Sequence, residues 1–400
     1  MTQPSTEGEP ERMRIFAHLA YGFDARQWEE KWRDGRLLGL NEPRPYGYHH
    51  AVEHGCDVVF STDHAESFIG HSLRGFLRLV LGFDVLHAFR NRHAMMAADV
   101  IWTHTESQHF AVSLLLKQRS ATHRPRLIAQ SVWLIDGWSR LHPHRQRFYR
   151  WLIESADVLT FLSPVNASVA SALFPGKPCE FVQFGIRADI QAAPRAGSVR
   201  SPLRILAVGN DRHRDWECLV SAFGNVAGFN LTIASQTIRT DLSSYRNIAV
   251  VTPRDNEALK LLYGAADLMV LPLKPNMHAS GITVLQEAAL FGLPTVASRV
   301  GGLDGYFRDD DVCFVEPGNP TLLRRAAQAF AANPQLSVHF ASRAQARMRA
   351  DDLGSRAYVS RHVALSHELL RGSRRRGEQA SHQADERSAT GSEPILDHAP

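Results

Sequence analysis

The chain has 400 residues, a length that exceeds one ordinary hydrophobic core and fits two domains of about 150 to 200 residues each. Its 44% hydrophobic and 22% charged residues are typical of a globular protein, and a net charge of +4 does not favour a nucleic-acid partner. The four cysteines form no CxxC pair, so neither a disulfide framework nor a cysteine zinc site is expected. The polar N-terminus and the lack of long apolar runs predict a cytoplasmic protein.

Short apolar runs rich in β-branched residues recur with helix-length spacers, which is the pattern of parallel strands buried in α/β domains. The first set of expected strands covers residues 14–19, 57–62, 99–104, 126–132, 157–163 and 180–185. The second set covers residues 204–209, 231–235, 248–252, 267–273, 294–298 and 312–315. The sequence therefore predicts an α/β protein with two doubly wound domains in tandem.

Domain boundaries follow from shifts in composition. Pro194, Gly197 and Pro202 mark a linker, and both ends of the chain are poor in apolar residues. The predicted segments are a disordered start (1–12), an N-terminal domain (13–190), a linker (191–202), a C-terminal domain (203–345), helices that cross back to the first domain (346–371) and a disordered tail (372–400).

The loop after the strand at 267–273 is the strongest candidate for a binding site. Ligands of parallel sheets bind at the carboxyl ends of the strands, where helix N-termini attract phosphates. We expect Ser280 to be the N-cap of the next helix and Gly281 to let a ligand approach the backbone. The first-turn amides of Ile282 and Thr283 are then expected to face a diphosphate.

Glu287 lies near the middle of that helix, where a carboxylate can accept two hydrogen bonds from a vicinal diol such as a ribose. From His278 onward, the stretch HASGITVLQEAALFGLPTVASRVGGLDGY resembles the donor signature of the retaining GT-B glycosyltransferases of family 4, the glycogen-synthase-like or group 1 glycosyltransferases. In that signature two glutamates precede a small-residue helix, a G-x-P turn, a strand and a double glycine. By this resemblance Glu287 holds the nucleotide ribose, while Ala279 stands at the position of the first glutamate.

The resemblance implies a GT-B fold, in which two Rossmann-like domains face each other across a cleft. It also implies transfer of a hexose from a nucleoside diphosphate (NDP) sugar to a hydroxyl of a glycan or polyprenol-linked saccharide, with retention, as in bacterial surface or exopolysaccharide synthesis. Such enzymes generally work without a divalent ion, so no metal or other cofactor is expected. His49-His50 and His142-Pro143-His144 lack a third ligand at metal spacing.

A second feature follows the strand at 204–209. Family members carry a Lys or Arg a few residues after this strand that holds the donor pyrophosphate, and Arg214 matches it, with Arg212 as the reserve. Asn210 stands where the family usually has an additional Arg.

The N-terminal half offers weaker signals. Tyr21 and Gly22 occupy the place of the family's glycine-rich acceptor loop, and His104 and Glu106 follow the strand at 99–104. Asp136 follows the strand at 126–132 and is the closest match to a family His or Asp near the transferred sugar, although Asp-Gly is also an ordinary turn pair. The candidate catalytic residues are Asp136, His104, Glu106 and His278.

Residues 68–93 alternate apolar and arginine residues, which is compatible with a segment that lies on an anionic inner membrane or with a core helix that has a basic face. Three other functions stay open. They are an inverting transferase with Asp136 as general base, a sugar-nucleotide epimerase, and an inactive partner subunit, the last motivated by Ala279 and Asn210.

Overall fold

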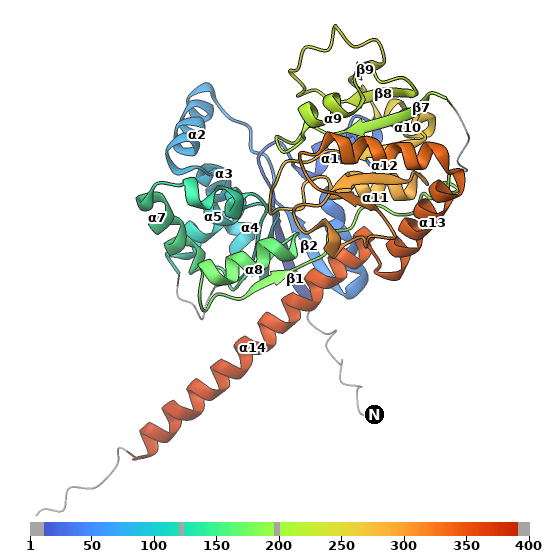
Figure 1. Cartoon of the computed structure of the whole chain (residues 1–400). Coiled ribbons are helices and arrows are strands. Elements are labelled where there is room, and N and C mark those ends of the chain that lie inside the picture. The colour runs from blue at the N-terminus through green and yellow to red at the C-terminus, as the bar shows by residue number, and fades with distance from the viewer. Residues whose placement is uncertain (1–11, 120–123, 196–200, 391–400) are drawn as a thin grey trace, which may run out of the picture.

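The computed structural model describes residues 12–119, 124–195 and 201–390. They form two α/β domains that lie side by side, and a long C-terminal helix returns from the second domain to the first (Figure 1). The predicted pair of tandem doubly wound domains is confirmed.

The N-terminal domain is built on a six-stranded parallel sheet in the order β2-β1-β3-β4-β5-β6. The strands are β1 (Met13–His18), β2 (Cys56–Phe60), β3 (Val100–Thr103), β4 (Arg126–Ser131), β5 (Val158–Phe161) and β6 (Cys179–Phe181). The helices are α1 (Ala25–Arg33), α2 (Phe68–Leu81), α3 (Val85–Arg90), α4 (Arg92–Met96), α5 (Glu106–Leu116), α6 (Leu134–Gly137), α7 (Pro143–Ile153) and α8 (Pro164–Leu173), with 3-10 segments η1 (Pro45–His54) and η2 (Trp138–Arg140). The central strands β3 and β5 are buried at every position, which explains their unbroken apolar runs.

The C-terminal domain has a second six-stranded parallel sheet, in the order β12-β11-β10-β7-β8-β9. The strands are β7 (Leu203–Val208), β8 (Phe229–Ala234), β9 (Ile248–Val251), β10 (Leu268–Leu271), β11 (Thr295–Ser298) and β12 (Cys313–Val315). The helices are α9 (Trp216–Phe223), α10 (Asn256–Ala265), α11 (Ile282–Leu290), α12 (Pro320–Ala332) and α13 (Pro334–Ala350), with the 3-10 turn η3 (Leu303–Gly305). Because the strand order reverses between β7 and β10, a ligand crevice is expected outside their carboxyl ends.

One apolar cluster crosses the domain boundary. It joins Leu40, Tyr48 and Trp102 of the first domain to Leu285 and Tyr306 of the second. The two domains are therefore held together by a shared core as well as by the polar contacts of the cleft.

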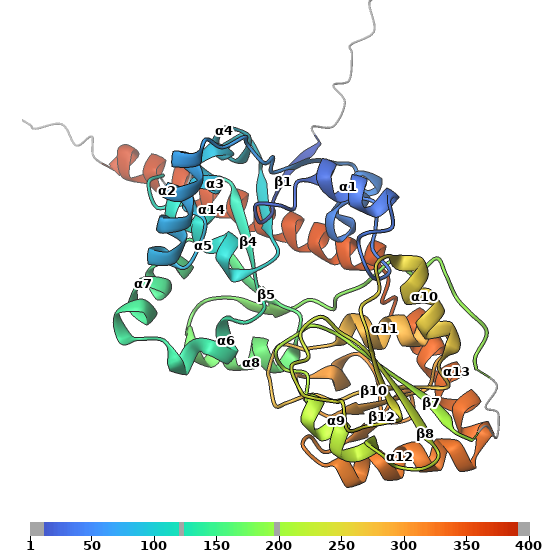
Figure 2. The same cartoon turned by 90° about the horizontal axis from the view of Figure 1, so that it is seen from above.

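The helix α14 (Ser355–Thr390) crosses back to the N-terminal domain and packs against it with its first part, while its C-terminal part projects away from both domains (Figures 1 and 2). The indole nitrogen of Trp102 donates to the Ser366 hydroxyl at 2.9 Å, and Tyr358 donates to Gln130 at 2.8 Å. Within the described ranges, no helix is both long enough and apolar enough to cross a membrane.

The expected disorder from residue 372 is wrong up to Thr390, because α14 continues to that residue. The segment is rich in Arg, Glu, Gln and Ala, which all favour helix, and it contains no proline, so the poor apolar content did not preclude a helix. Residues 391–400 and 1–11, where disorder was also expected, lie outside the described residues, as does part of the expected linker (196–200). The described part of the linker lies beside the C-terminal end of α11, since Ala192 N donates to Leu290 O at 2.8 Å.

Candidate active site

A cavity of about 340 Å³ opens at the carboxyl ends of β7 and β8 and at the N-terminus of α11. The N-terminal domain contributes Leu38 and Gly39 to its wall. The other lining residues are Val208, Gly209, Asn210, Asp211, Arg214, Ala234, Ser235, Gln236, Pro253, Leu259, Gly281, Thr283 and Val284. The cavity thus lies where the strand order places a ligand crevice.

Arg214 is the cation in this wall, and only 5% of it is exposed. Its Nε donates to Val208 O at 3.0 Å and its Nη1 donates to the Ser280 hydroxyl at 3.0 Å. Nη2 has no hydrogen-bond partner in the part of the chain that the structure describes. Burial lowers the pKa of Arg214 to about 10, so the guanidinium still carries its charge at neutral pH. This arrangement holds an anion-binding group in place at the predicted position.

The position of the Arg214 side chain requires a glycine at residue 209. Its φ is +143°, and a Cβ at this position would lie 2.2 Å from Arg214 Nε. The guanidinium can therefore lie over the end of β7 only because the residue there has no side chain.

The loop between β10 and α11, residues 272–281, differs from the expected helix start. Gly281, with a φ of +82°, is the N-cap of α11, so the expectation that Ser280 caps the helix is wrong. Ser280 lies one residue too early and instead accepts the hydrogen bond from Arg214. The amide of Ile282 donates to Ala279 O at 3.2 Å, while Thr283 lines the cavity. The helix N-terminus still faces the cavity, but through fewer free amides than expected.

Glu287 is 6% exposed, and both of its carboxylate oxygens accept hydrogen bonds. Tyr263 donates to Oε2 at 2.6 Å, and the backbone N–H of Leu40 donates to Oε1 at 3.0 Å. Burial raises the pKa of Glu287, although the bonds from Tyr263 and Leu40 oppose that shift. Since each carboxylate oxygen has two lone pairs, a ribose hydroxyl can bind alongside these partners or replace Leu40.

Leu40 is part of a segment of the N-terminal domain, residues 35–41, that packs against the C-terminal domain. Gly39 N donates to Asn256 Oδ1 at 2.8 Å, Asn256 N donates to Gly35 O at 2.9 Å, and Asn256 Nδ2 donates to Leu37 O at 2.9 Å. This segment therefore fixes the position of one domain relative to the other beside Glu287.

Two of the candidate catalytic residues, His278 and Asp136, meet across the cleft. Asp136 Oδ2 is 2.6 Å from His278 Nδ1, and Asp136 Oδ1 accepts from Met277 N at 2.8 Å. His278 Nε2 is 3.4 Å from Asp211 Oδ2, and Asp211 Oδ1 also accepts from the backbone N–H of His213 at 2.6 Å. The imidazole of His278 therefore lies between two carboxylates from different domains.

These contacts determine the charges. Burial alone would lower the pKa of His278, but the hydrogen bonds and charges of Asp136 and Asp211 outweigh it and raise the pKa. Burial would raise the pKa of either carboxyl, but the bond to His278 reverses this and lowers both, that of Asp211 most strongly. The two carboxylates therefore favour the charged form of the His278 imidazole.

A second cavity of about 310 Å³ lies on the N-terminal side of the cleft. Its lining includes His104, Trp133 and Tyr46 of the first domain and Thr283 and Glu287 of the second. The ring of His104 stacks on Tyr46 with 3.3 Å between centroids, and Gln130 Nε2 donates to its Nδ1 at 3.0 Å. Burial lowers the pKa of His104 to about 3, so its imidazole is neutral. This cavity adjoins the first one, since Leu38 and Thr283 line both.

The other predicted residues lie apart from these cavities. Glu106 Oε2 accepts from the backbone N–H groups of Val132 and Trp133, at 3.0 and 3.3 Å, and so positions the turn that carries Trp133. Gly22 N donates to Asp63 at 2.9 Å and Arg74 lies 3.9 Å over the Tyr21 ring, but neither Tyr21 nor Gly22 is among the residues that line the two cavities.

Arg212 is exposed and lies beside Trp133 and Asp211, outside the wall that holds Arg214. Asp136, His213 and His278 also present three possible metal-ligand atoms within 4.8 Å of one another. In this group each imidazole is already paired with a carboxylate, so the arrangement is explained by ion pairs without a metal ion.

Sequence reasoning missed three contributors to the site: Asp211, Tyr263 and the 35–41 segment. Asp211 follows β7 at a carboxyl end, which is a signal that could have identified it. Tyr263 reaches Glu287 from α10, and the 35–41 segment comes from another domain, so no local pattern indicates either of them.

Comparison with known proteins agrees with this geometry. Residues 202–333 match the family model for glycosyl transferases group 1. D-inositol 3-phosphate glycosyltransferase from Mycobacteroides abscessus is 28% identical over 151 residues, which make up 37% of this chain and 33% of the relative, so the match spans about a third of that protein.

Two solved structures are similar over almost the whole chain. Sucrose-phosphate synthase from Thermosynechococcus elongatus has a TM-score of 0.67 at 17% identity, covering 90% of this chain and 100% of that chain. Anabaena HepE in complex with UDP and glucose has a TM-score of 0.61 at 16% identity, covering 89% and 100%. The two sheets and the cleft between them thus define the GT-B fold of glycosyltransferases. Within it, the part of the chain that matches the glycosyl transferases group 1 model lies in the second domain.

Proposed function

We propose that this protein transfers a hexose from an NDP-sugar to a hydroxyl of a glycan or lipid-linked saccharide, with retention and without a metal ion in the reaction. The observation that carries the proposal is the buried Arg214. It is anchored by Val208 and Ser280 in the wall of a cavity that the helix N-terminus also faces. A bacterial surface or exopolysaccharide is the product class that we propose.

In this proposal the leaving diphosphate is stabilised electrostatically. Arg214 retains its charge at neutral pH and has Nη2 available for a phosphate oxygen, while the N-terminus of α11 adds a partial positive charge. Glu287, which lines the neighbouring cavity together with Thr283, holds the ribose in this proposal. The front-face mechanism favoured for such enzymes needs no protein nucleophile, and in this proposal the two domains close over the donor to exclude water.

An inverting mechanism with Asp136 as general base is disfavoured by the contacts of that carboxylate. Both oxygens accept hydrogen bonds and its pKa is lowered, so it is a poor acceptor for a substrate proton. We therefore propose that Asp136 orients His278, which lies next to the position where the family contacts the sugar.

Isothermal titration with UDP, GDP and ADP tests the donor assignment directly, and a UDP-sugar is the first choice because HepE was solved with UDP and glucose. Arg214→Ala should weaken binding of the preferred nucleotide about 10- to 100-fold, because a charge-assisted hydrogen bond contributes about 1.5–3 kcal/mol. Arg212→Ala is the matched control and should leave the affinity unchanged. Equal affinities in the wild type and Arg214→Ala would contradict the assignment.

Turnover separates the remaining alternatives. Incubation with NDP-sugars and saccharide acceptors should release NDP and extend the acceptor. An altered sugar without any acceptor would identify an epimerase instead. Tight NDP binding without transfer to any acceptor would support the inactive subunit that Ala279 and Asn210 suggested.

We also propose that α2 places the enzyme on an anionic membrane, where polyprenol-linked acceptors are found. Its apolar side is strongly exposed, with Phe68 at 86%, Leu79 at 81% and Ile69 at 78%. Arg74 is buried against Glu66 and Asp84, whereas Arg78 is exposed beside these apolar side chains and can meet an anionic headgroup. In a flotation assay with phosphatidylglycerol vesicles, the wild type should be recovered in the vesicle fraction, whereas the double variant Ile69→Ser/Leu79→Ser should remain in the soluble fraction. Equal flotation of both proteins would refute this role.

A further inference from the structure

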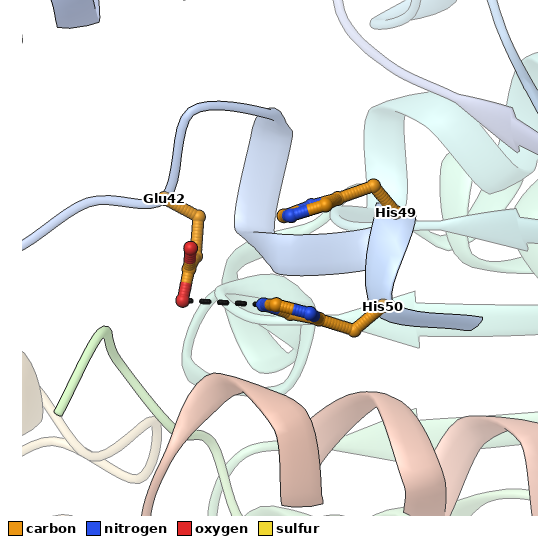
Figure 3. A group of neighbouring side chains, drawn as sticks. All are labelled: Glu42, His49 and His50. Atoms are coloured by element: carbon orange, nitrogen blue, oxygen red, sulfur yellow. Dashed lines mark ion pairs between the residues drawn. The ribbon is translucent and has the colours of Figure 1, made fainter. Parts of the chain in front are cut away.

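Two adjacent histidines in η1 face a carboxylate that the sequence alone did not connect to them. His49 and His50 lie directly opposite Glu42 (Figure 3). One ligand atom from each of the three residues lies within 4.8 Å of the other two. The third ligand that the histidine pair lacked is therefore supplied by the loop that precedes η1.

We propose that Glu42, His49 and His50 bind one divalent transition-metal ion, with Zn²⁺ as the preferred species. Two imidazoles and one carboxylate form a common protein ligand set for Zn²⁺, and water completes the tetrahedron. Ligand atoms at about 2.1 Å from a tetrahedral ion lie about 3.4 Å apart. The 3.3 Å between Glu42 Oε1 and His50 Nε2 already has this value.

The ring nitrogens of both histidines support the assignment. His49 Nδ1 and His50 Nε2 are buried, and neither has a hydrogen-bond partner among the described residues. His50 is only 5% exposed, so this nitrogen has little access to bulk water. Leaving buried polar atoms unsatisfied costs free energy, and metal coordination would satisfy His50 Nε2, the nitrogen that faces Glu42.

The other nitrogen of His50 has the partner that a metal ligand usually has. Nδ1 lies 2.9 Å from Glu53 Oε1, and a carboxylate in this position fixes the tautomer that leaves Nε2 free to coordinate. Glu53 also pairs with Arg356, and Glu42 accepts from the Ser355 hydroxyl at 2.5 Å. Both carboxylates thus contact the first turn of α14.

The local backbone is shaped to bring the three ligands together. Tyr46 and Gly47 have φ values of +53° and +74°, and this kink folds η1 back toward Glu42. A Cβ on Gly47 would lie 3.0 Å from the Ser355 Cβ and 3.3 Å from the Glu42 Cγ. The ion would therefore stabilise the junction between η1 and the returning helix α14, rather than act on the diphosphate.

The test uses the full-length protein, stripped with a chelator and dialysed against ZnCl₂ in phosphate-free buffer. Elemental analysis should find one Zn²⁺ per chain, and Co²⁺ in its place should give the visible absorption of a tetrahedral site. His49→Ala is the informative variant, because it removes a ligand whose Nδ1 has no protein partner. It should weaken Zn²⁺ binding at least about 100-fold and abolish the rise in melting temperature that Zn²⁺ gives the wild type.

His144→Ala is the control, since this exposed histidine belongs to the other histidine pair, and it should bind Zn²⁺ like the wild type. His213→Ala tests the ion-paired group in the cleft and should also retain the metal. Absence of stoichiometric Zn²⁺ in the wild type would overturn the proposal, and so would loss of the metal in His213→Ala but not in His49→Ala. The result is independent of nucleotide binding, so it does not depend on the proposed transferase activity.

Discussion

The ion pair between Asp136 and His278 leads to a quantitative prediction of how the stability of the protein depends on pH. Asp136→Asn keeps the shape and the bond from Met277 but removes the charge opposite the imidazolium. The two side chains are 7% and 3% exposed, so solvent screens the pair little. A hydrogen bond between charged groups contributes about 1.5–3 kcal/mol. We expect Asp136→Asn to lower the free energy of unfolding by about 1.5–2 kcal/mol, the lower end of this range, because His278 remains paired with Asp211.

The pH dependence follows from the shifted pKa values. The raised pKa of His278 gives a contribution that is complete below the ordinary value of about 6.5 and is lost as the pH rises through the folded value. The lowered pKa of Asp136 gives a contribution that is present above about 3.9 and is lost as the pH falls through its folded value. The wild type should therefore exceed Asp136→Asn in stability most between about pH 4 and 6.5, and the difference should shrink at higher pH.

Thermal unfolding followed by circular dichroism at a series of pH values measures this difference. A loss of about 2 kcal/mol corresponds to a melting temperature lower by roughly 4 to 8 °C for a domain of this size. Asp309→Asn is the control, because Asp309 is 72% exposed and pairs with Arg299 on the surface. It should change stability by less than about 1 kcal/mol. A difference between Asp136→Asn and the wild type that stays constant from pH 5 to 9 would refute the reasoning.

Three further substitutions test the glycine and alanine positions. Gly39→Ala would place a Cβ 2.6 Å from Glu287 Oε1 at a φ of +100°, so it should separate the domains and increase the radius of gyration in X-ray scattering. An unchanged radius would contradict this role of the 35–41 segment. Gly209→Ala should displace the Arg214 guanidinium and weaken NDP binding about 10-fold or more by calorimetry; unchanged affinity would show that the guanidinium is not held there. Ala279 has a φ of +54°, so Ala279→Gly should raise stability by up to about 1 kcal/mol, whereas a loss of stability in urea unfolding would indicate that the methyl group matters more.

The sheets were predictable mainly because their inner strands, such as β3 and β10, are buried on both faces, whereas edge strands such as β9 are partly exposed. Buried strands appear as apolar runs whatever packs on them, and each of the twelve strands overlaps an expected run. The boundaries were less predictable where tertiary contacts end a strand. Residues 180–185 were expected as one strand, yet β6 ends at Phe181, and the chain then leaves the sheet to pair at Ile186 with Gly354.

The site was predictable only where its residues are close in sequence. The segment from His278 to Glu287 and the basic loop at Arg214 each lie in one strand-loop-helix unit, so spacing and family resemblance identified them. The partner of Glu287 in the N-terminal domain, Leu40, is 247 residues away, and the bond is made by a backbone N–H that no side-chain pattern encodes. Asp136 was found by its place after a strand, but its pairing with His278, 142 residues away, depends on how the two domains meet.

Ala279 connects these observations. Its buried methyl group and left-handed backbone leave no carboxylate at the position of the family's first glutamate. The adjacent His278 instead brings the loop between β10 and α11 next to two carboxylates, Asp211 from its own domain and Asp136 from the other. Because Asp136 reaches His278 only when the domains are together, the charge beside this loop depends on closure of the cleft. An open cleft would leave His278 with Asp211 alone and a lower pKa, so closure and the protonation of His278 favour each other.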